Sequence, residues 1–172
     1  MDKESLLTAQ LAKVLALKCG FAPIMTEYIG MAAVLHDIGK TFISKSIINK
    51  PGPLSPQERE IIKTHTVLGA DIFLGLQGPF GIIARNVCRF HHEDFNSGGY
   101  WNKSTTDLPL YVPIVAICDR YVALVNRRVY KPAWPHADAL DYIRSKAGEQ
   151  FCPKLVDIFI ETMNEERMDI LN

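Results

Sequence analysis

The stretch from residue 29 to residue 40 constrains this chain most, because an uncharged apolar segment ends there in His36 and Asp37. Residues 29–35 are expected to be buried, so the imidazole and the carboxylate that follow would enter the interior. A buried charge is costly unless a partner satisfies it. Nitrogen and oxygen ligands suit a divalent metal ion, and Gly39 lets the helix end and the backbone approach a ligand. A His-Asp pair alone, however, is more typical of a helix terminus or a turn.

The other histidines favour the metal interpretation. The chain has five histidines, and all but His136 lie beside apolar helical runs, which is a poor pattern for solvated side chains. Any one of the four is better explained as a core residue hydrogen-bonded to backbone carbonyls, but four together favour a shared ligand. With two aspartates they give six nitrogen and oxygen ligands from four segments, more than one zinc ion needs. The six are His36, Asp37, His65, His91, His92 and Asp119.

Apolar residues recur at helical spacing along most of the chain, and no stretch is typical of a β-strand. The fold is therefore expected to be all-α. The polar, glycine-containing and aromatic segment after His92 is expected to be a loop, and loops of this length are usually functional or disordered. The expected helices cover residues 5–19, 23–35, 42–48, 56–74, 82–90, 113–126, 135–146 and 153–168.

The clearest helix start lies at Ser55, which is followed by proline at the first helical position and by Glu58, placed to complete a capping box. His65 falls within the register of this helix. The residues that the helix is expected to bury are Ile61, Ile62, Leu68, Ile72 and Phe73.

The chain of 172 residues is 48% hydrophobic and 22% charged, as expected of one domain over residues 1–172 that can bury a sizeable core. Nineteen basic residues balance nineteen acidic ones, which argues against extended nucleic acid or a membrane surface as a partner, but allows a small phosphate-bearing ligand. The four widely spaced cysteines are expected to be reduced core thiols. No signal peptide or membrane-spanning run is visible, so we expect a cytoplasmic protein.

An ordered series of motifs runs along nearly the whole chain: His36-Asp37-Ile38-Gly39-Lys40, Lys50-Pro51-Gly52-x-Leu54, His65 with Gly69, His91-His92-Glu93, Gly99-Tyr100, Asp119 and Arg128-x-Tyr130-Lys131. This series resembles the HD superfamily of metal-dependent phosphohydrolases and, within it, the HD-GYP family of cyclic di-GMP phosphodiesterases. The resemblance implies an HD-domain helical bundle with about five core helices, followed here by C-terminal helices. It also implies two, sometimes three, divalent transition metal ions, commonly iron or manganese.

Three positions depart from this family. Its first helix usually begins with a histidine ligand, where this chain has Glu4, whose carboxylate would reach the same ion. Its signature loop reads Gly-Tyr-Pro, where this chain has Trp101 in place of the proline. A second acid often follows three residues after the metal-binding aspartate, where this chain has Val122.

The resemblance also implies roles for the ligands. Asp37, with two oxygens at the centre of the first motif, would bridge two ions and would be the central catalytic residue. Two ions held a few ångström apart can share a hydroxide and neutralise a phosphodiester. The expected division gives one ion His36, His65 and Asp119, and gives the other ion His91 and His92.

Basic and aromatic residues are candidates for substrate contacts. Lys40 would place its charge on a phosphate oxygen during catalysis, or else cap the end of a helix. Arg128 and Lys131 suit phosphate contacts from a basic turn, although an exposed loop charge explains them equally well. Tyr100 and Trp101 would either stack on a guanine or pack their loop onto the bundle.

The expected function is therefore a metal-dependent phosphodiesterase that hydrolyses cyclic di-GMP to linear pGpG, with onward hydrolysis to GMP left open. Two alternatives stay open. The first is a degenerate, non-catalytic HD-GYP module that binds metal or dinucleotide and signals through a protein partner, such as a GGDEF-type protein. The second is an HD phosphohydrolase that acts on another nucleotide. The departures at positions 4, 101 and 122 are the reason to keep the first alternative.

Overall fold

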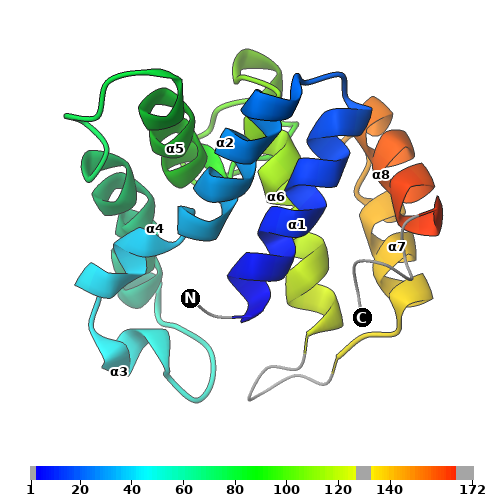
Figure 1. The fold of residues 1–172 in the computed structure, drawn as a ribbon. Coiled ribbons are helices and arrows are strands. Elements are labelled where there is room, and N and C mark those ends of the chain that lie inside the picture. Colours follow the sequence, from blue (N-terminus) through cyan, green and yellow to red (C-terminus); the bar gives the residue numbers. More distant parts are fainter. Residues whose placement is uncertain (1–2, 127–132, 166–172) are drawn as a thin grey trace.

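The computed structural model describes residues 3–126 and 133–165, and over these residues the chain is helical, with no β-strand (Figure 1). The expected all-α class is confirmed. An isolated β-bridge between Ala147 and Phe151 closes a turn. The α-helices are α1 (Lys3–Lys18), α2 (Pro23–Leu35), α3 (Lys45–Ile48), α4 (Pro56–Asp71), α5 (Pro79–Phe90), α6 (Tyr111–Val125), α7 (His136–Ser145) and α8 (Pro153–Glu165). Two 3-10 helices, η1 (Ile38–Phe42) and η2 (Thr105–Asp107), lie between them.

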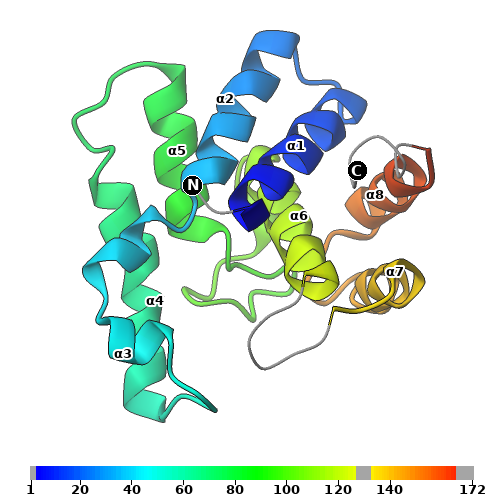
Figure 2. The same ribbon diagram turned by 60° about the horizontal axis from the view of Figure 1, so that its bottom comes forward.

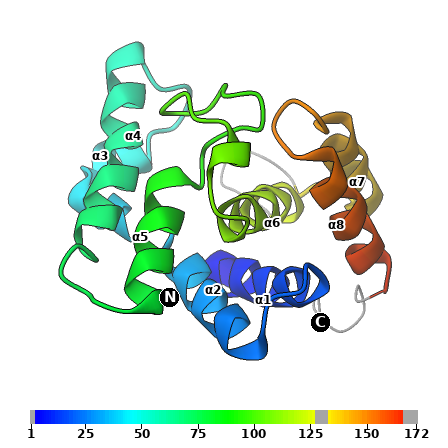
Figure 3. The same ribbon diagram turned by 90° about the horizontal axis from the view of Figure 1, so that it is seen from above.

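Five of these helices form the bundle that carries the site. The helix α1 packs against α2 and α6, α2 packs against α5, and α4 packs against α5 and η1. The helices α7 and α8 pack against α6 and α1, on the side away from α4 (Figures 1 and 3). The expected arrangement of core helices followed by C-terminal helices is therefore confirmed.

The helix α6 is the central element of the core. Seen from above, it runs alongside α1, with α5 on one side and α7 and α8 on the other (Figure 3). Its buried residues run from Tyr111 to Cys118 without interruption and continue with Tyr121, Val122 and Leu124. Full burial of large apolar side chains of this kind contributes about 1.5–3 kcal/mol each. Because α6 is enclosed, it carries Asp119 into the interior.

The helix α4 begins as expected but turns a different face to the core. Glu58 N donates a hydrogen bond to Ser55 Oγ at 3.2 Å, and Ser55 N donates one to the Glu58 carboxylate at 2.7 Å, so the capping box is confirmed. However, the expectation that Ile61 and Ile72 are buried is wrong, because these side chains are 44% and 47% exposed. The residues that α4 buries are His65, Thr66, Gly69 and Ala70.

The close approach of η1 explains this small and polar face. A Cβ atom added to Gly39 would lie 1.9 Å from the carbonyl oxygen of His65 and 2.6 Å from the backbone nitrogen of Gly69. No side chain fits in that space, so glycine is required in η1, and large apolar residues on this face of α4 would push η1 away. The isoleucines therefore turn outward, while His65 faces the interior.

Several helix boundaries differ from those expected. The expected helix over residues 42–48 is two elements, η1 and α3, with Ser44 as the N-cap of α3. The helix α5 begins at Pro79, three residues earlier than expected, because proline suits the first helical turn. All four cysteines are free thiols, as expected. Among the described helices, none combines the length and the apolar character needed to cross a membrane.

Candidate metal centre

The predicted ligands come from four segments that meet at one end of the bundle. His36 is the C-cap residue of α2, and Asp37 directly precedes η1. His91 is the C-cap residue of α5, and His92 follows it. The remaining two ligands lie within α4 and α6. Figure 2 brings this end of the bundle forward, with the first turn of α1 and the last turn of α2 close together.

Asp37 is at the centre of the cluster. Its Oδ1 atom lies 3.2 Å from His65 Nε2 and 3.6 Å from His91 Nε2. Its Oδ2 atom lies 3.3 Å from His36 Nε2, which in turn lies 3.4 Å from Asp119 Oδ1. Two carboxylates and three imidazoles from different helices therefore converge within a few ångström of one another.

The distances divide the ligands differently from the expected division. His65 was expected to share an ion with His36 and Asp119. Its Nε2 atom instead lies 3.4 Å from His91 Nε2. Among the residues that the structure describes, Asp37, His65, His91 and His92 form a group of candidate ligand atoms that all lie within 4.8 Å of one another.

Backbone carbonyls fix the orientation of three of the imidazoles. The Nδ1 atoms of His36, His65 and His91 lie 2.6, 2.5 and 3.0 Å from carbonyl oxygens three or four residues earlier in the chain. When Nδ1–H donates to a carbonyl, Nε2 becomes the atom that can bind a metal. All three Nε2 atoms face Asp37, and their lone pairs would be repelled by its carboxylate unless a proton or a metal ion lay between them.

Asp37 itself supplies a second indication of a cation. Its Oδ1 atom is buried and accepts no hydrogen bond, despite the nearby imidazoles. Its Oδ2 atom forms an ion pair with Lys40. A buried carboxylate oxygen without a hydrogen bond is costly, and a metal ion would satisfy it. The chemistry of this donor set therefore fits a divalent metal ion.

The pKa values in the cluster follow from burial and from the mutual charges. Burial favours the neutral ring of His36, but the carboxylates of Asp119 and Asp37 outweigh it and raise the pKa of His36 well above its usual value. Burial opposes ionisation of Asp37 and Asp119, but the neighbouring imidazoles outweigh it and lower the pKa of both carboxyls. Burial lowers the pKa of His91 and His92, so both rings are neutral near pH 7 and offer ligand nitrogens.

A cavity of about 890 Å³ opens above this cluster. Five of the six predicted ligands line it and form what we call its floor, whereas His91 does not line it. Glu4, from the first turn of α1, lines the same cavity, and so do Lys40 and Tyr100. The floor residues are His36, Asp37, His65, His92 and Asp119.

The predicted substrate residues are placed unequally. The Tyr100 ring lies over that of His92, with 4.5 Å between the ring centroids. Trp101 does not line the cavity. Its Nε1–H donates to Thr66 Oγ1 at 3.1 Å and its ring stacks under the Arg89 guanidinium, so it packs the loop onto the bundle. The basic turn with Arg128 and Lys131 lies outside the described residues.

Some residues around the cavity escaped the sequence analysis. Ile48 and Asn49 from α3 and its C-cap, and Asn126 from the C-cap of α6, also line the cavity. Nothing in their local sequence marks them, because their place depends on how α3 and α6 pack. Glu93 is 2% exposed and accepts hydrogen bonds from the loop. The signal in the sequence was its place in the motif His91-His92-Glu93, which did not state its role.

Comparisons with known proteins agree with this geometry. The sequence matches the family described as "HD domain" over residues 1–155. The chain is 34% identical over 152 residues to a cyclic di-GMP phosphodiesterase of Thermotoga maritima, covering 88% of this chain and 41% of that protein. It is 33% identical over 153 residues to the cyclic di-GMP phosphodiesterase response regulator RpfG of Xanthomonas campestris, covering 88% and 40%. A 3'3'-cGAMP-specific phosphodiesterase 2 of Vibrio cholerae is 34% identical over 147 residues, covering 85% and 28%.

Solved structures show the same fold. The HDG"Y"P protein Bd1817 of Bdellovibrio bacteriovorus matches 94% of this chain and 51% of its own, with a TM-score of 0.73 and 19% identity. The HD domain of the phosphodiesterase PgpH of L. monocytogenes, in complex with cyclic-di-AMP, matches 96% and 90%, with a TM-score of 0.68 and 22% identity. The chain spans about two-fifths of the length of the first two curated relatives. The family match, the helical bundle and the His-Asp cluster lead to one conclusion: the chain belongs to the HD domain family.

Proposed function

We propose that this chain is a metal-dependent phosphodiesterase that hydrolyses cyclic di-GMP to linear pGpG, with GMP as a further product. The observation that carries the proposal is the buried Asp37 Oδ1 atom, which faces imidazole nitrogens and accepts no hydrogen bond, at the floor of a cavity lined by Lys40. The relatives named as cyclic di-GMP phosphodiesterases support the same substrate class.

We infer that the residues on either side of Asp37 would hold two ions. The carboxylate has one oxygen near His36, which adjoins Asp119, and the other near His65 and His91. His92 completes the second group. Mixed imidazole and carboxylate ligands suit iron or manganese, and we propose one of these metals. Glu4, at the cavity wall, is the candidate additional ligand in place of the family's histidine.

The bound ions would lower the pKa of a water molecule and neutralise the charge of a phosphodiester. The remaining roles belong to side chains of this chain. Lys40 holds its ammonium group against Asp37 at the cavity, where a non-bridging phosphate oxygen would also lie. Tyr100 offers a ring face at the wall for a purine base. Arg128 and Lys131 stay predicted phosphate contacts from a part of the chain that the structure does not describe.

The experiment that tests this function uses protein stripped of metal and reloaded with iron or manganese under anaerobic, reducing conditions. We expect about two ions per chain and release of linear dinucleotide from cyclic di-GMP. The same preparation is offered 3'3'-cGAMP and cyclic di-AMP, since relatives and structural neighbours act on or bind these molecules. Asp37→Ala provides the background.

Three other outcomes would contradict this proposal, and the first two of them would support an alternative function. Loaded protein that binds cyclic di-GMP without turnover above the Asp37→Ala background is a non-catalytic receptor module. Loaded protein that neither binds nor cleaves it, but hydrolyses another nucleotide, is an HD phosphohydrolase of different specificity. Less than about half an ion per chain after reloading contradicts the metal centre itself.

Three further expectations are kept as proposals. They are a single domain over residues 1–172, a cytoplasmic location and a GGDEF-type or other signalling protein as a partner. Limited proteolysis, fractionation of cells and a pull-down with purified GGDEF domains test them in turn.

A further inference from the structure

Glu93 is a buried acid that follows the paired histidines and lies outside the candidate ligand group. Its side chain accepts two backbone hydrogen bonds, one at each oxygen. Trp101 N donates to Oε1 and Lys103 N donates to Oε2, both at 2.8 Å. Hydrogen bonds to a charged acceptor are roughly twice as strong as neutral ones. Glu93 therefore closes the loop of residues 94–103 back onto its own start.

The closed loop rests directly on the peptide between His92 and Glu93. A Cβ atom added to Gly99 would lie 2.5 Å from both His92 O and Glu93 Cα, so only glycine allows this approach. The next residue, Tyr100, then lies over the His92 ring with 4.5 Å between centroids and 43° between planes. The two hydrogen bonds at Glu93 thus fix the point at which Tyr100 enters the cavity wall.

The two hydrogen bonds that Glu93 accepts, from Trp101 N and Lys103 N, are called the clamp below. The clamp depends on which residue stands at position 101. A proline has no backbone N–H, so the first of the two hydrogen bonds exists here because position 101 is tryptophan. The indole adds a hydrogen bond to Thr66 and a contact of 4.3 Å between its ring centroid and the Arg89 guanidinium. Hydrogen bonds and packing therefore replace the constraint of a proline ring.

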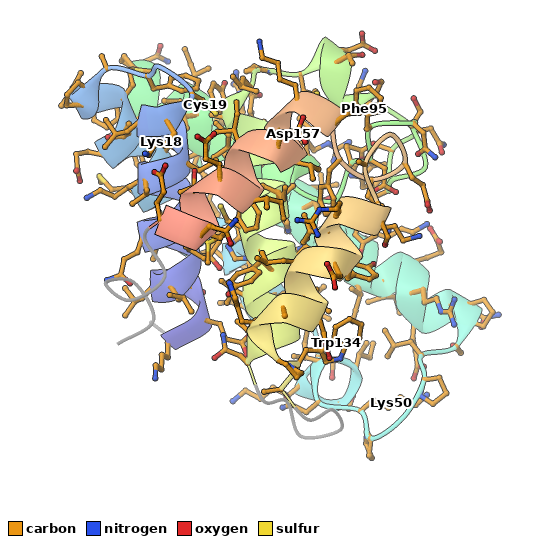
Figure 4. All side chains as sticks on the ribbon, turned by 90° about the vertical axis from the view of Figure 1, so that its right-hand side faces the viewer. Lys18, Cys19, Lys50, Phe95, Trp134 and Asp157 are labelled. Carbon is orange, nitrogen blue, oxygen red and sulfur yellow. The ribbon has the colours of Figure 1, made fainter. Side chains whose placement is uncertain are left out.

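The first part of the loop is fixed separately. Phe95 N and Asn96 N donate to the carbonyl oxygens of Gln150 and Glu149, in the turn between α7 and α8. Figure 4 shows Phe95 beside this turn. The stem of the loop is therefore held by the C-terminal helices, and the part that reaches the cavity is held by Glu93.

We propose that Glu93 is a positioning residue that holds Tyr100 at the cavity wall and thereby sets how tightly the cyclic dinucleotide binds. This role rests on the proposed function. Glu93 acts through the loop and does not line the cavity. The helices α2, α4 and α5, which carry or end at floor ligands, pack directly against one another, α2 against α5 and α5 against α4. Loss of the clamp therefore raises KM and leaves kcat and metal content close to those of the wild type.

The test compares Glu93→Ala and Glu93→Gln with Asp107→Asn, which changes an exposed acid of the same connection and serves as the matched control. We expect KM for cyclic di-GMP to rise about tenfold in Glu93→Ala and about threefold in Glu93→Gln, which keeps one acceptor. In both variants kcat and metal per chain should stay within about twofold of the wild type, on the same reasoning. Asp107→Asn should change neither constant.

Tryptophan fluorescence gives a readout that needs neither metal nor substrate. The chain has two tryptophans, so a Trp134→Phe background leaves Trp101 as the single reporter. We expect its emission to shift to the red, and its quenching by acrylamide to rise, in the order wild type, Glu93→Gln, Glu93→Ala. Trp101→Pro, which removes the N–H but keeps Glu93, should raise KM at least as much as Glu93→Gln.

The inference is overturned if both Glu93 variants keep the wild-type KM and Trp101 emission. It is also overturned if kcat and metal content fall while KM is unchanged, because Glu93 would then support the floor. An unchanged KM in Trp101→Pro would also overturn the inference. Failure of the proposed function is distinguishable, since it shows as wild-type protein that lacks turnover, whereas failure of this inference shows as active wild type with unaffected variants.

Discussion

The floor and the rim of the cavity hold their side chains in different ways. At the floor, His36 and His65 are fixed at Nδ1 by carbonyls of the chain just before them, as is the adjoining predicted ligand His91. The rim consists of Lys40 and Tyr100. Lys40 comes from a 3-10 helix and forms an ion pair with Asp37, and Tyr100 comes from a loop and places its ring over that of His92. The floor is therefore built into the helical bundle, whereas the rim depends on contacts between loops and the bundle.

This difference separates two tasks. Ligands for metal ions tolerate only small displacements, so the elements that carry them must be rigid. Recognition of a substrate can change through residues whose displacement leaves the helices intact. We expect substitutions at the floor to affect metal content and turnover together, and substitutions at the rim to affect substrate binding or rate alone.

The largest effect is expected at the centre of the floor. Asp37→Ala removes the carboxylate that faces imidazoles at the end of α2, in α4 and at the end of α5, so turnover should fall at least about a thousandfold and metal content should fall with it. Metal analysis and product release measure the two quantities. Asp71→Ala, an exposed acid at the end of α4, is the control. Full metal content in Asp37→Ala would contradict its bridging role.

A smaller effect is expected at Lys40. Lys40→Ala removes one positive charge from the cavity, so turnover should fall by about ten- to a thousandfold. Metal content should stay near that of the wild type, because Lys40 is not a ligand. Steady-state kinetics measure the loss, with the exposed Lys45→Ala as a matched control. If metal content fell as much as turnover, Lys40 would be needed for metal binding, like the residues of the floor.

Glu4 tests where the floor ends. Glu4→Ala should weaken the binding of one ion by about tenfold, the low end of the effect of losing a supporting group at a metal site. Glu4→His, which restores the family's residue, should bind that ion at least as tightly as the wild type. Competition with a chromogenic chelator measures both affinities, and Glu161→Ala on α8 is the control. Unchanged affinity in Glu4→Ala would leave Glu4 as a helix-end acid.

The smallest effect concerns pH and the stability of metal-free protein. The raised pKa of His36 contributes stability that is complete below the unfolded value of about 6.5 and is lost as pH rises through the folded value. The lowered pKa values of His91, His92, Asp37 and Asp119 change stability only below about pH 6.5, where it falls as pH decreases. Between pH 6.5 and 8 the metal-free protein should therefore lose stability.

The size of this loss is limited to about 1 kcal/mol for a change of one pH unit, equivalent to about 2–4 °C in Tm for a chain of this size. Metal-loaded protein should not show it, because an ion takes the place of the proton on His36. Thermal unfolding of both forms at pH 6.5, 7.25 and 8 makes the comparison. Parallel pH profiles for the two forms would mean that His36 does not exchange its proton for metal.

The sequence predicted the floor better than the rim, for a physical reason. The ligands lie at the ends or on the inner faces of helices that the apolar pattern and the capping box had located, so their convergence followed from packing. The rim depends on contacts between segments without periodicity. Trp101 had two equally plausible roles until Thr66 and Arg89 were seen beside it.

The buried face of α4 could not be predicted from hydrophobicity, because a backbone approach sets it. Ile61 and Ile72 are the most apolar choices for the interior, yet η1 comes too close to leave room for them. Gly39 and Gly69, two glycines in separate motifs, are the residues that allow this close approach. The sequence alone does not indicate that they contact each other.

The spacing of the ligands along the chain has a consequence for folding kinetics. His36, His65, His91 and Asp119 are each about thirty residues apart, so the cluster exists only after four helices have docked. An interaction that is absent from the transition state for folding, as we expect of a cluster that needs four docked helices, slows unfolding and leaves the folding rate almost unchanged. A bound ion should therefore slow unfolding strongly and leave the folding rate almost unchanged. Bound metal would thus lengthen the lifetime of the folded chain. Metal-free protein would be degraded faster than metal-loaded protein by proteases that cleave the chain once it has unfolded spontaneously.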